Sequence, residues 1–148
     1  MTNTSSAVAL SQPLYGATFR QAVRRFFSKY GTFSGRASLS EFWWVALFTF
    51  LLSVVIVGVV YAVVYTTGVP REDGSIEYSY AGVAVSLVAL LIALALVIPN
   101  IALTVRRLHD ANFSGWFYLL SLLPSVGNII ILILTLMPSR AEGARFDK

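Results

Sequence analysis

The stretch that decides the fold is WWVALFTFLLSVVIVGVVYAVVYT, residues 43–66. It carries no acidic or basic side chain. At 1.5 Å per residue in a helix it is long enough to cross a hydrocarbon core of roughly 30 Å. Trp43 and Trp44 stand at its start and Tyr61 and Tyr65 near its end, where membrane helices place aromatic rings at the two interfaces. The stretch therefore predicts a membrane-spanning helix.

Two further apolar stretches follow. Residues 81–105 are long enough to span, and they contain Pro99 and Asn100, which favour a kink satisfied by neighbouring helices. Residues 116–137 are interrupted by PSVGN at 124–128, and each half is too short to cross alone. For this third segment we favour one kinked span over a re-entrant pair. The predicted fold is all-α: a polytopic membrane protein with three membrane segments, the third broken or re-entrant.

The composition agrees with a membrane protein. Of the 148 residues 57% are hydrophobic and only 12% are charged, against roughly a quarter charged in soluble domains. With no cysteine and only His109 as a histidine, we expect neither a metal site nor a cofactor. The net charge of +4 comes from basic residues beside apolar stretches, which favours an anionic lipid surface over nucleic acid. The expected partners are the bilayer, anionic lipids, and a second copy or another membrane protein.

The amino-terminal region predicts a tail and a helix. Residues 1–13 are small and polar and are expected to be a disordered tail. Residues 17–30 predict an amphipathic helix that either lies among the lipid headgroups or packs its aromatic face on the protein's own helices. Its apolar arc holds Phe19, Ala22, Val23, Phe26, Phe27 and Tyr30. Its polar arc holds Arg20, Gln21, Arg24, Arg25, Ser28 and Lys29.

These features divide the chain into four parts. After the tail come the interfacial helix and its connector (14–40), a transmembrane domain (41–137) and a polar carboxyl-terminal tail (138–148). Five basic residues precede the first span and only Arg71 lies in the following loop. The positive-inside rule therefore predicts a cytoplasmic amino terminus in a bacterial inner membrane. Three full spans would put the basic carboxyl-terminal tail outside, a conflict that a re-entrant third segment removes.

The candidate chemistry is limited. His109 and Asp110 are the natural general base and orienting carboxylate, but adjacent residues on a helix do not face each other. The three apolar stretches hold no Asp, Glu, Lys, Arg or His, although an ion-coupled transporter needs such groups inside the membrane. We therefore expect no catalytic residue and a non-enzymatic scaffold, partner-binding or lipid-interacting protein. The alternative is a small transporter or channel component that acts as an oligomer.

Three motifs carry a family resemblance. They are FSGRASLSEFWW at 33–44, RRLHD at 106–110 with SGW at 114–116, and LPSVG at 123–127. On these motifs the chain resembles the YhaH-type family of small bacterial inner-membrane proteins (domain of unknown function 805). The resemblance implies a multi-pass membrane protein with no assigned activity. The family typically has a basic residue between 38 and 41 and a glycine near 112, where this chain has Leu39 and Asn112.

The predicted topology brings the polar motif residues to one cytoplasmic membrane face. We expect an interfacial polar cluster, formed where the connector docks on the loop between the second and third segments, in which arginines either pair with the carboxylates or hold lipid phosphates. Pairing is the favoured alternative. The predicted cluster consists of Arg36, Glu41, Arg106, Arg107, His109, Asp110 and Trp116.

Overall fold

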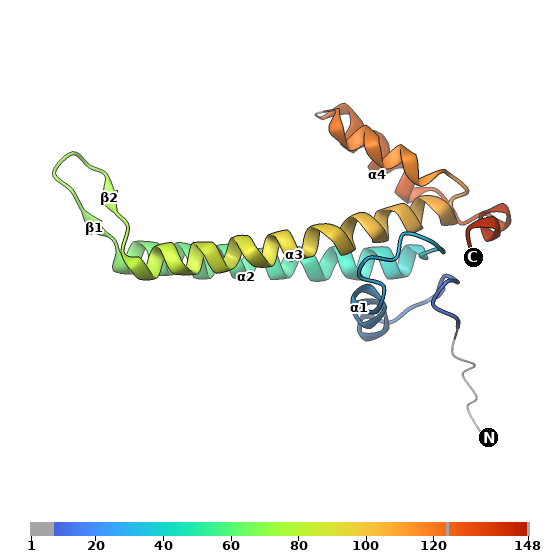
Figure 1. Cartoon of the computed structure of the whole chain (residues 1–148), viewed down its shortest axis with the longest axis horizontal. Coiled ribbons are helices and arrows are strands. Elements are labelled where there is room, and N and C mark those ends of the chain that lie inside the picture. Colours follow the sequence, from blue (N-terminus) through green and yellow to red (C-terminus); the bar gives the residue numbers. More distant parts are fainter. Residues whose placement is uncertain (1–7, 124, 148) are drawn as a thin grey trace, which may run out of the picture. The chain divides into compact units, whose positions relative to one another are not determined.

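The computed structural model describes residues 8–123 and 125–147 and confirms a predominantly helical fold (Figure 1). The only strands among these residues are two of two residues each. In chain order the elements are α1 (Phe19–Ser28), α2 (Leu39–Thr67), β1 (Val69–Pro70), β2 (Ile76–Glu77), α3 (Tyr80–Asp110), the 3-10 helix η1 (Gly115–Leu122), α4 (Val126–Leu136) and the 3-10 helix η2 (Ala141–Phe146).

The chain forms two compact units. We call Leu47–Val97 the hairpin unit, and Met1–Ala46 together with Ile98–Lys148 the polar unit. Both α2 and α3 are long and apolar enough to cross a membrane, whereas α4 is a shorter apolar helix. The first two predicted membrane segments are thus each a continuous helix, and Pro99 lies inside the second.

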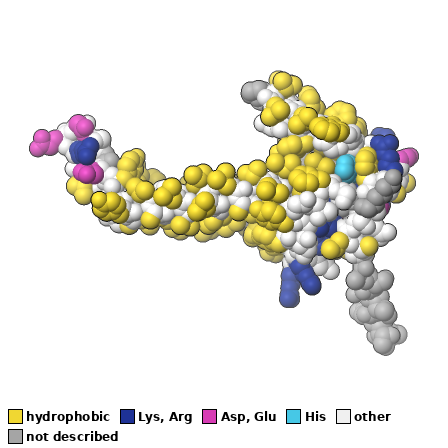
Figure 2. All heavy atoms as spheres, in the orientation of Figure 1, with side chains coloured by type: hydrophobic (Ala, Val, Ile, Leu, Met, Phe, Trp, Pro, Cys, Tyr) yellow, Lys and Arg dark blue, Asp and Glu magenta, His cyan; other side chains and the backbone are white. Residues whose placement is uncertain are grey.

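The hairpin unit contains two antiparallel helices that lie side by side (Figure 1). Gly82 is buried against Val64, to whose side chain a Cβ at this glycine would lie 3.5 Å away. The hydroxyls of Thr67 and Ser79 are 2.5 Å apart at the end of the pair. Most other side chains of this unit are exposed and apolar, and Figure 2 shows them along the helices, with acidic and basic groups gathered at the β1–β2 turn. Such a surface suits lipid contact.

Helix α1 begins two residues after the predicted start, because Thr18 and Gln21 form a capping box there. Its buried face corrects the predicted arcs. Ala22 and Phe26 are buried as expected, but so are Arg25 and, directly after the helix, Lys29. The two basic residues belong to the interior of the polar unit and not to the solvent-facing arc.

The predicted disordered tail is also corrected in part. Residues 1–7 lie outside the described residues. Pro13 is buried, the carbonyl oxygen of Ser11 accepts a hydrogen bond from the Arg36 amide (2.9 Å), and that of Gln12 accepts one from Arg25 (2.5 Å). Residues 8–13 are therefore a packed part of the polar unit.

The third apolar segment, residues 116–137, forms a second helical hairpin, which belongs to the polar unit and not to the hairpin unit. Helices η1 and α4 pack against each other so closely that a Cβ at Gly127 would lie 1.7 Å from the carbonyl oxygen of Leu120. Only a glycine permits that approach. The Ser125 residue before α4 has a φ of 63°, which reverses the chain direction at this point.

Both ends of this hairpin return to the same end of α3. At its start, a Cβ at Gly115 would lie 2.7 Å from a methyl group of Val105. At its end, the carbonyl oxygen of Thr135 accepts a hydrogen bond from Arg107 (2.9 Å). The expectation of one kinked span is therefore wrong, and the arrangement is that of the re-entrant alternative. Each half is short, and packing the two halves together buries more apolar surface than extending them.

Candidate functional site

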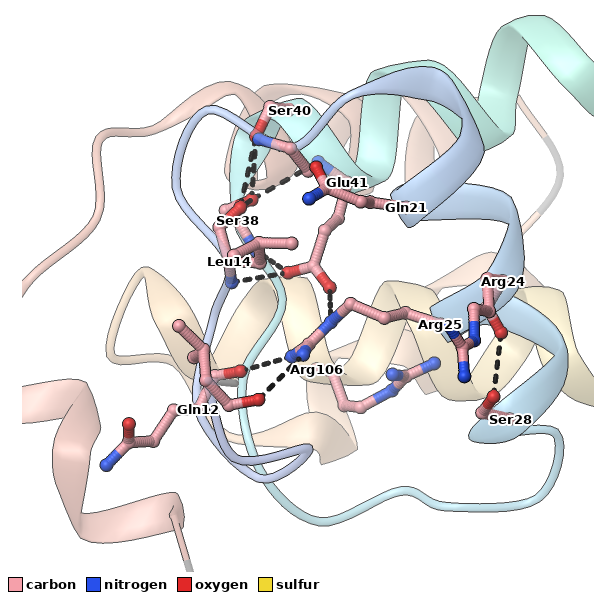
Figure 3. A network of polar contacts seen from close by, with 12 residues as sticks. Gln12, Leu14, Gln21, Arg24, Arg25, Ser28, Ser38, Ser40, Glu41 and Arg106 are labelled. Atoms are coloured by element: carbon pink, nitrogen blue, oxygen red, sulfur yellow. Dashed lines mark hydrogen bonds and ion pairs between the residues drawn. The ribbon is translucent and has the colours of Figure 1, made fainter. Parts of the chain in front are cut away.

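The first polar network surrounds Glu41 in the first turn of α2 (Figure 3). This carboxylate is buried. It accepts hydrogen bonds from Arg25 Nε (2.5 Å), from the Leu14 amide (3.0 Å) and from the Ser38 amide (3.0 Å). The Ser38 hydroxyl in turn accepts from the Glu41 amide (3.2 Å). Ser38 and Glu41 thus form a capping box at the start of α2, with the carboxylate shared between the cap and an ion pair.

Arg25 connects α1, α2 and the amino-terminal segment. Besides its ion pair with Glu41, it donates to the carbonyl oxygens of Gln12 (2.5 Å) and Val8 (3.3 Å). The Ser40 hydroxyl adds a second link between these parts, since it accepts from the Ala17 amide (3.0 Å). A buried guanidinium with a carboxylate and several carbonyl partners is well satisfied, so this network holds α1 against the start of α2.

The second network surrounds Asp110, the last residue of α3, whose side chain is fully buried. It accepts hydrogen bonds from Arg107 (2.5 Å) and from the Tyr15 hydroxyl (3.1 Å). It also accepts one from the Ser139 hydroxyl. One carboxylate therefore joins the amino-terminal segment, α3 and the carboxyl-terminal segment. Burial is the main reason why the Tyr15 pKa is raised.

Arg36 and Asp147 fasten the connector to the carboxyl-terminal segment. The guanidinium donates two parallel hydrogen bonds to the carboxylate, at 2.8 and 2.6 Å, and it lies 3.9 Å from Asp110. The hydrogen bond to Asp147 raises the pKa of Arg36, so it stays charged. The backbone agrees, because the Gly35 amide donates to the carbonyl oxygen of Phe146 (2.8 Å).

The His109 ring forms no hydrogen bond or ion pair with a carboxylate among the residues that the structure describes. Its Nδ1 lies 3.1 Å from the carbonyl oxygen of Gly35, and its ring stacks on Phe146 with centroids 4.0 Å apart. The Asp110 carboxylate is committed to other donors, so the two adjacent residues do not form a base and its orienting acid. An open pocket of roughly 620 Å³ lies beside the ring. It is lined by Ser34, His109, Ser114, Arg145 and Phe146.

Two buried cations of the polar unit, Arg106 and Lys29, each have a side-chain nitrogen that meets no hydrogen-bond partner among the described residues. Arg106 is 1% exposed, and its Nε donates to the carbonyl oxygen of Ala102, one turn earlier (3.0 Å), but its Nη2 meets no hydrogen-bond partner in the described structure. Lys29 is 2% exposed, and its Nζ likewise has none. Burial, followed by the charge of Arg25, lowers the Lys29 pKa to about 8.

The structure brings six of the seven predicted cluster residues into the polar unit's interior or its edge. They form two adjoining networks and the His109 stack rather than one constellation. Trp116 is 78% exposed and lies outside them. Within the described residues no three His, Asp or Glu side chains lie close enough to hold a metal ion.

Sequence reasoning missed several members of these networks. The missed residues are Tyr15, Arg25, Lys29, Ser139 and Asp147. For Arg25 and Lys29 a signal existed: they stand four residues apart, in α1 and at its C-cap, and Ala22 and Phe26 are buried on the same side of the helix. The other three come from segments without a periodic pattern, so no local signal pointed to them.

Comparison with known proteins gives the chain a family. The model of the family described as "Protein of unknown function (DUF805)" matches residues 30–148. The chain belongs to the DUF805 family. It is also 30% identical, over 106 residues, to "Inner membrane protein YhaI" of Escherichia coli K12, covering 70% of this chain and 73% of the relative. The same protein of E. coli O157:H7 matches equally. No solved structure matches.

This membership agrees with the helices described above. A DUF805 protein similar to a named inner membrane protein, with two helices of spanning length, is an integral membrane protein. The family match covers the connector, both long helices, the α4 hairpin and the carboxyl-terminal segment. Helix α1 precedes it, so the cations of α1 lie outside the matched residues.

Proposed function

We propose that this DUF805 protein is a non-enzymatic, lipid-interacting protein of the inner membrane whose α1 surface binds anionic headgroups on the cytoplasmic side. The observation that carries the proposal is the pair of arginines on the exposed face of α1, Arg20 and Arg24. They stand one turn apart and form no ion pair with any residue that the structure describes. Each basic residue near an anionic surface adds about 1 kcal/mol of attraction.

The position of α1 supports this proposal. The ring of Phe19 meets that of Trp44 edge-on, with centroids 5.9 Å apart, and the Arg25–Glu41 ion pair fixes the helix to the first turn of α2. Since α2 enters the bilayer at that point, α1 lies at the depth of the headgroups. Phe27 on α1 and Trp43 at the start of α2 are both nearly half exposed, as interfacial aromatic residues are.

Headgroup preference is measured by tryptophan quenching in the full chain. In a Trp116→Phe background the remaining indoles, Trp43 and Trp44, lie beside α1. Brominated phosphatidylglycerol should then quench them with a relative association constant on the order of tenfold above brominated phosphatidylcholine. The double variant Arg20→Gln/Arg24→Gln should lose most of this preference, and high salt should weaken it. Arg71→Gln, in the β1–β2 turn, is the matched control. Equal quenching by the two lipids in the Trp116→Phe protein would refute the proposal.

The orientation has its own test, because the chain contains no cysteine. Single cysteines at Ser75, in the β1–β2 turn, and at Ala144, in η2, can be labelled in intact cells with a maleimide that does not cross the inner membrane. With the amino terminus in the cytoplasm, Ser75→Cys should react and Ala144→Cys should react only after the membrane is opened. The reverse pattern would place α1 on the other side.

A further inference from the structure

The interior of the polar unit contains more positive charge than its carboxylates neutralise. The charges of Arg25, Lys29 and Arg106 act on one another, and they are offset chiefly by one carboxylate, Glu41, with a weaker effect of Asp147 on Lys29. Figure 3 shows the side chains of Arg25, Glu41 and Arg106 close together between α1 and α3. Removing an ion from water costs several kcal/mol unless it is paired and hydrogen-bonded. A local excess of buried positive charge therefore needs an explanation.

The carboxylates nearby are already committed. One oxygen of Glu41 accepts from Arg25 and the other from two backbone amides. Both oxygens of Asp147 accept from Arg36. Accordingly, Lys29 Nζ and Arg106 Nη2 remain buried without a hydrogen-bond partner among the described residues. They supply donors and charge but have no acceptor.

We infer that a phosphate group binds between Lys29, at the end of α1, and Arg106, on α3. A phosphate offers several strong acceptor oxygens and a negative charge. It can therefore take the free Nη2 of the guanidinium and the ammonium together, and charge-assisted hydrogen bonds of this kind are the strong ones. Lys29 directly follows the last residue of α1, and its neighbours Ser28 and Tyr30 are exposed. Because both side chains are buried, binding requires this end of the helix to move.

The phosphate has two possible sources, a phospholipid headgroup and free inorganic phosphate. Both present the same chemistry to the two cations. The inference rests on the buried pair alone and does not depend on the proposed headgroup binding by the exposed arginines of α1. If the source is a lipid, this site adds a specific position to that general attraction.

The bound species is identified first. The full chain is extracted in a mild detergent and examined by native mass spectrometry and by phosphorus NMR after denaturation. We expect one phosphate-containing species per chain, either a phospholipid or inorganic phosphate, which the two methods distinguish by mass and chemical shift. Protein freed of lipid and phosphate is then titrated in thermal unfolding experiments. The probes are inorganic phosphate in one series and micelles doped with phosphatidylglycerol or phosphatidylcholine in another.

The variants assign the binding to the site. Lys29→Met nearly keeps the length of the side chain and removes the charge, and Arg106→Met removes the charge on α3 with a shorter apolar side chain. Each should weaken the apparent affinity for the effective probe by tenfold or more, because each removes charge-assisted hydrogen bonds. Lys29→Met should not impair folding without the probe, since it removes a buried unpaired charge, whereas Arg106→Met also removes the hydrogen bond to Ala102. The double variant Arg20→Gln/Arg24→Gln leaves the site intact and should keep the binding.

Each outcome decides the inference. A phospholipid that is lost in Lys29→Met establishes the lipid source, and stabilisation by inorganic phosphate that depends on Lys29 establishes the free source. If no probe stabilises the protein and no phosphorus is retained, the inference is overturned. It is also overturned if Lys29→Met and Arg106→Met bind as the unmodified protein does. Loss of lipid preference only in the α1 surface variant would support the proposed function and overturn the inferred buried site.

Discussion

Replacing Asp110 by Asn removes one negative charge from a fully buried position and keeps the shape of the side chain. One oxygen of Asp110 accepts from Tyr15, and the other accepts from Arg107 and Ser139. Asparagine retains a single acceptor oxygen, so its NH₂ group must face donors on one side of the network. Removing one member of a buried ion pair costs about 3–5 kcal/mol. For a chain of this size we expect a melting temperature lower by roughly 10 °C.

The assay is thermal unfolding in detergent, followed by tryptophan fluorescence at neutral pH. Asp73→Asn is the matched control, because Asp73 is an exposed carboxylate that accepts only from Ser75 in the β1–β2 turn. This variant should have the same melting temperature as the unmodified protein. If Asp110→Asn also has the melting temperature of the unmodified protein, Asp110 does not hold the three segments together and the reasoning on the second network is wrong.

Three further predictions concern single residues. Burial lowers the Lys29 pKa from 10.5 to about 8 in the folded state. Between these pH values the folded state therefore binds fewer protons than the unfolded state does. In phosphate-free detergent, stability relative to Lys29→Met should then rise by up to about 3 kcal/mol from pH 8 to 10.5, and a flat difference in melting temperature would contradict this. Asn112 has a φ of 67° and a buried Oδ1 without a described partner, so Asn112→Gly should stabilise the protein by about 1 kcal/mol in the same assay, and a loss would count against it. Gly127→Ala places a Cβ against the Leu120 carbonyl and should destabilise by about 3 kcal/mol, whereas Gly58→Ala, with open space around it, should not destabilise.

The sequence was a good guide wherever a single segment determines its own structure. The apolar stretches predicted α2 and α3 because length and composition are enough to make a membrane helix. The Ser38–Glu41 capping box is equally local, since both partners lie within one turn. The left-handed φ of Asn112 is the backbone conformation that favours glycine.

The sequence was a poor guide wherever distant segments compete for the same residue. Periodicity placed Arg25 on the solvent side of α1, but a buried carboxylate on α2 lies opposite it in the folded chain. The third segment has two apolar halves of equal character. Only the packing of Gly127 against η1 and the return of Thr135 to Arg107 decide between a span and a hairpin. Contacts between residues this far apart in the sequence produce no periodic pattern of hydrophobic and polar residues.

The pairing of charges separates the structural arginines of the polar unit from those left for a ligand. Each of its buried or half-buried carboxylates already holds one arginine from another segment or turn, in the pairs Arg25–Glu41, Arg107–Asp110 and Arg36–Asp147. Pairing was the favoured prediction for Arg36, Arg106 and Arg107. The structure pairs Arg107 with Asp110 and Arg36 chiefly with Asp147, but Glu41 pairs with Arg25, and Arg106 forms no ion pair with the residues that the structure describes. Arg25, Arg36 and Arg107 are thus the paired arginines. Replacing any of them should therefore lower stability before it affects binding.

The cations that remain differ in position and so in what they can bind. On the surface of α1, Arg20 and Arg24 are solvated, and their attraction to anionic lipid is screened by salt and does not distinguish one anionic headgroup from another. Lys29 and Arg106 are buried, where a single bound phosphate is weakly screened and geometrically fixed. Added salt should consequently weaken the general lipid preference while leaving the bound phosphate in place. That contrast follows from burial alone, because all four side chains carry the same kind of charge.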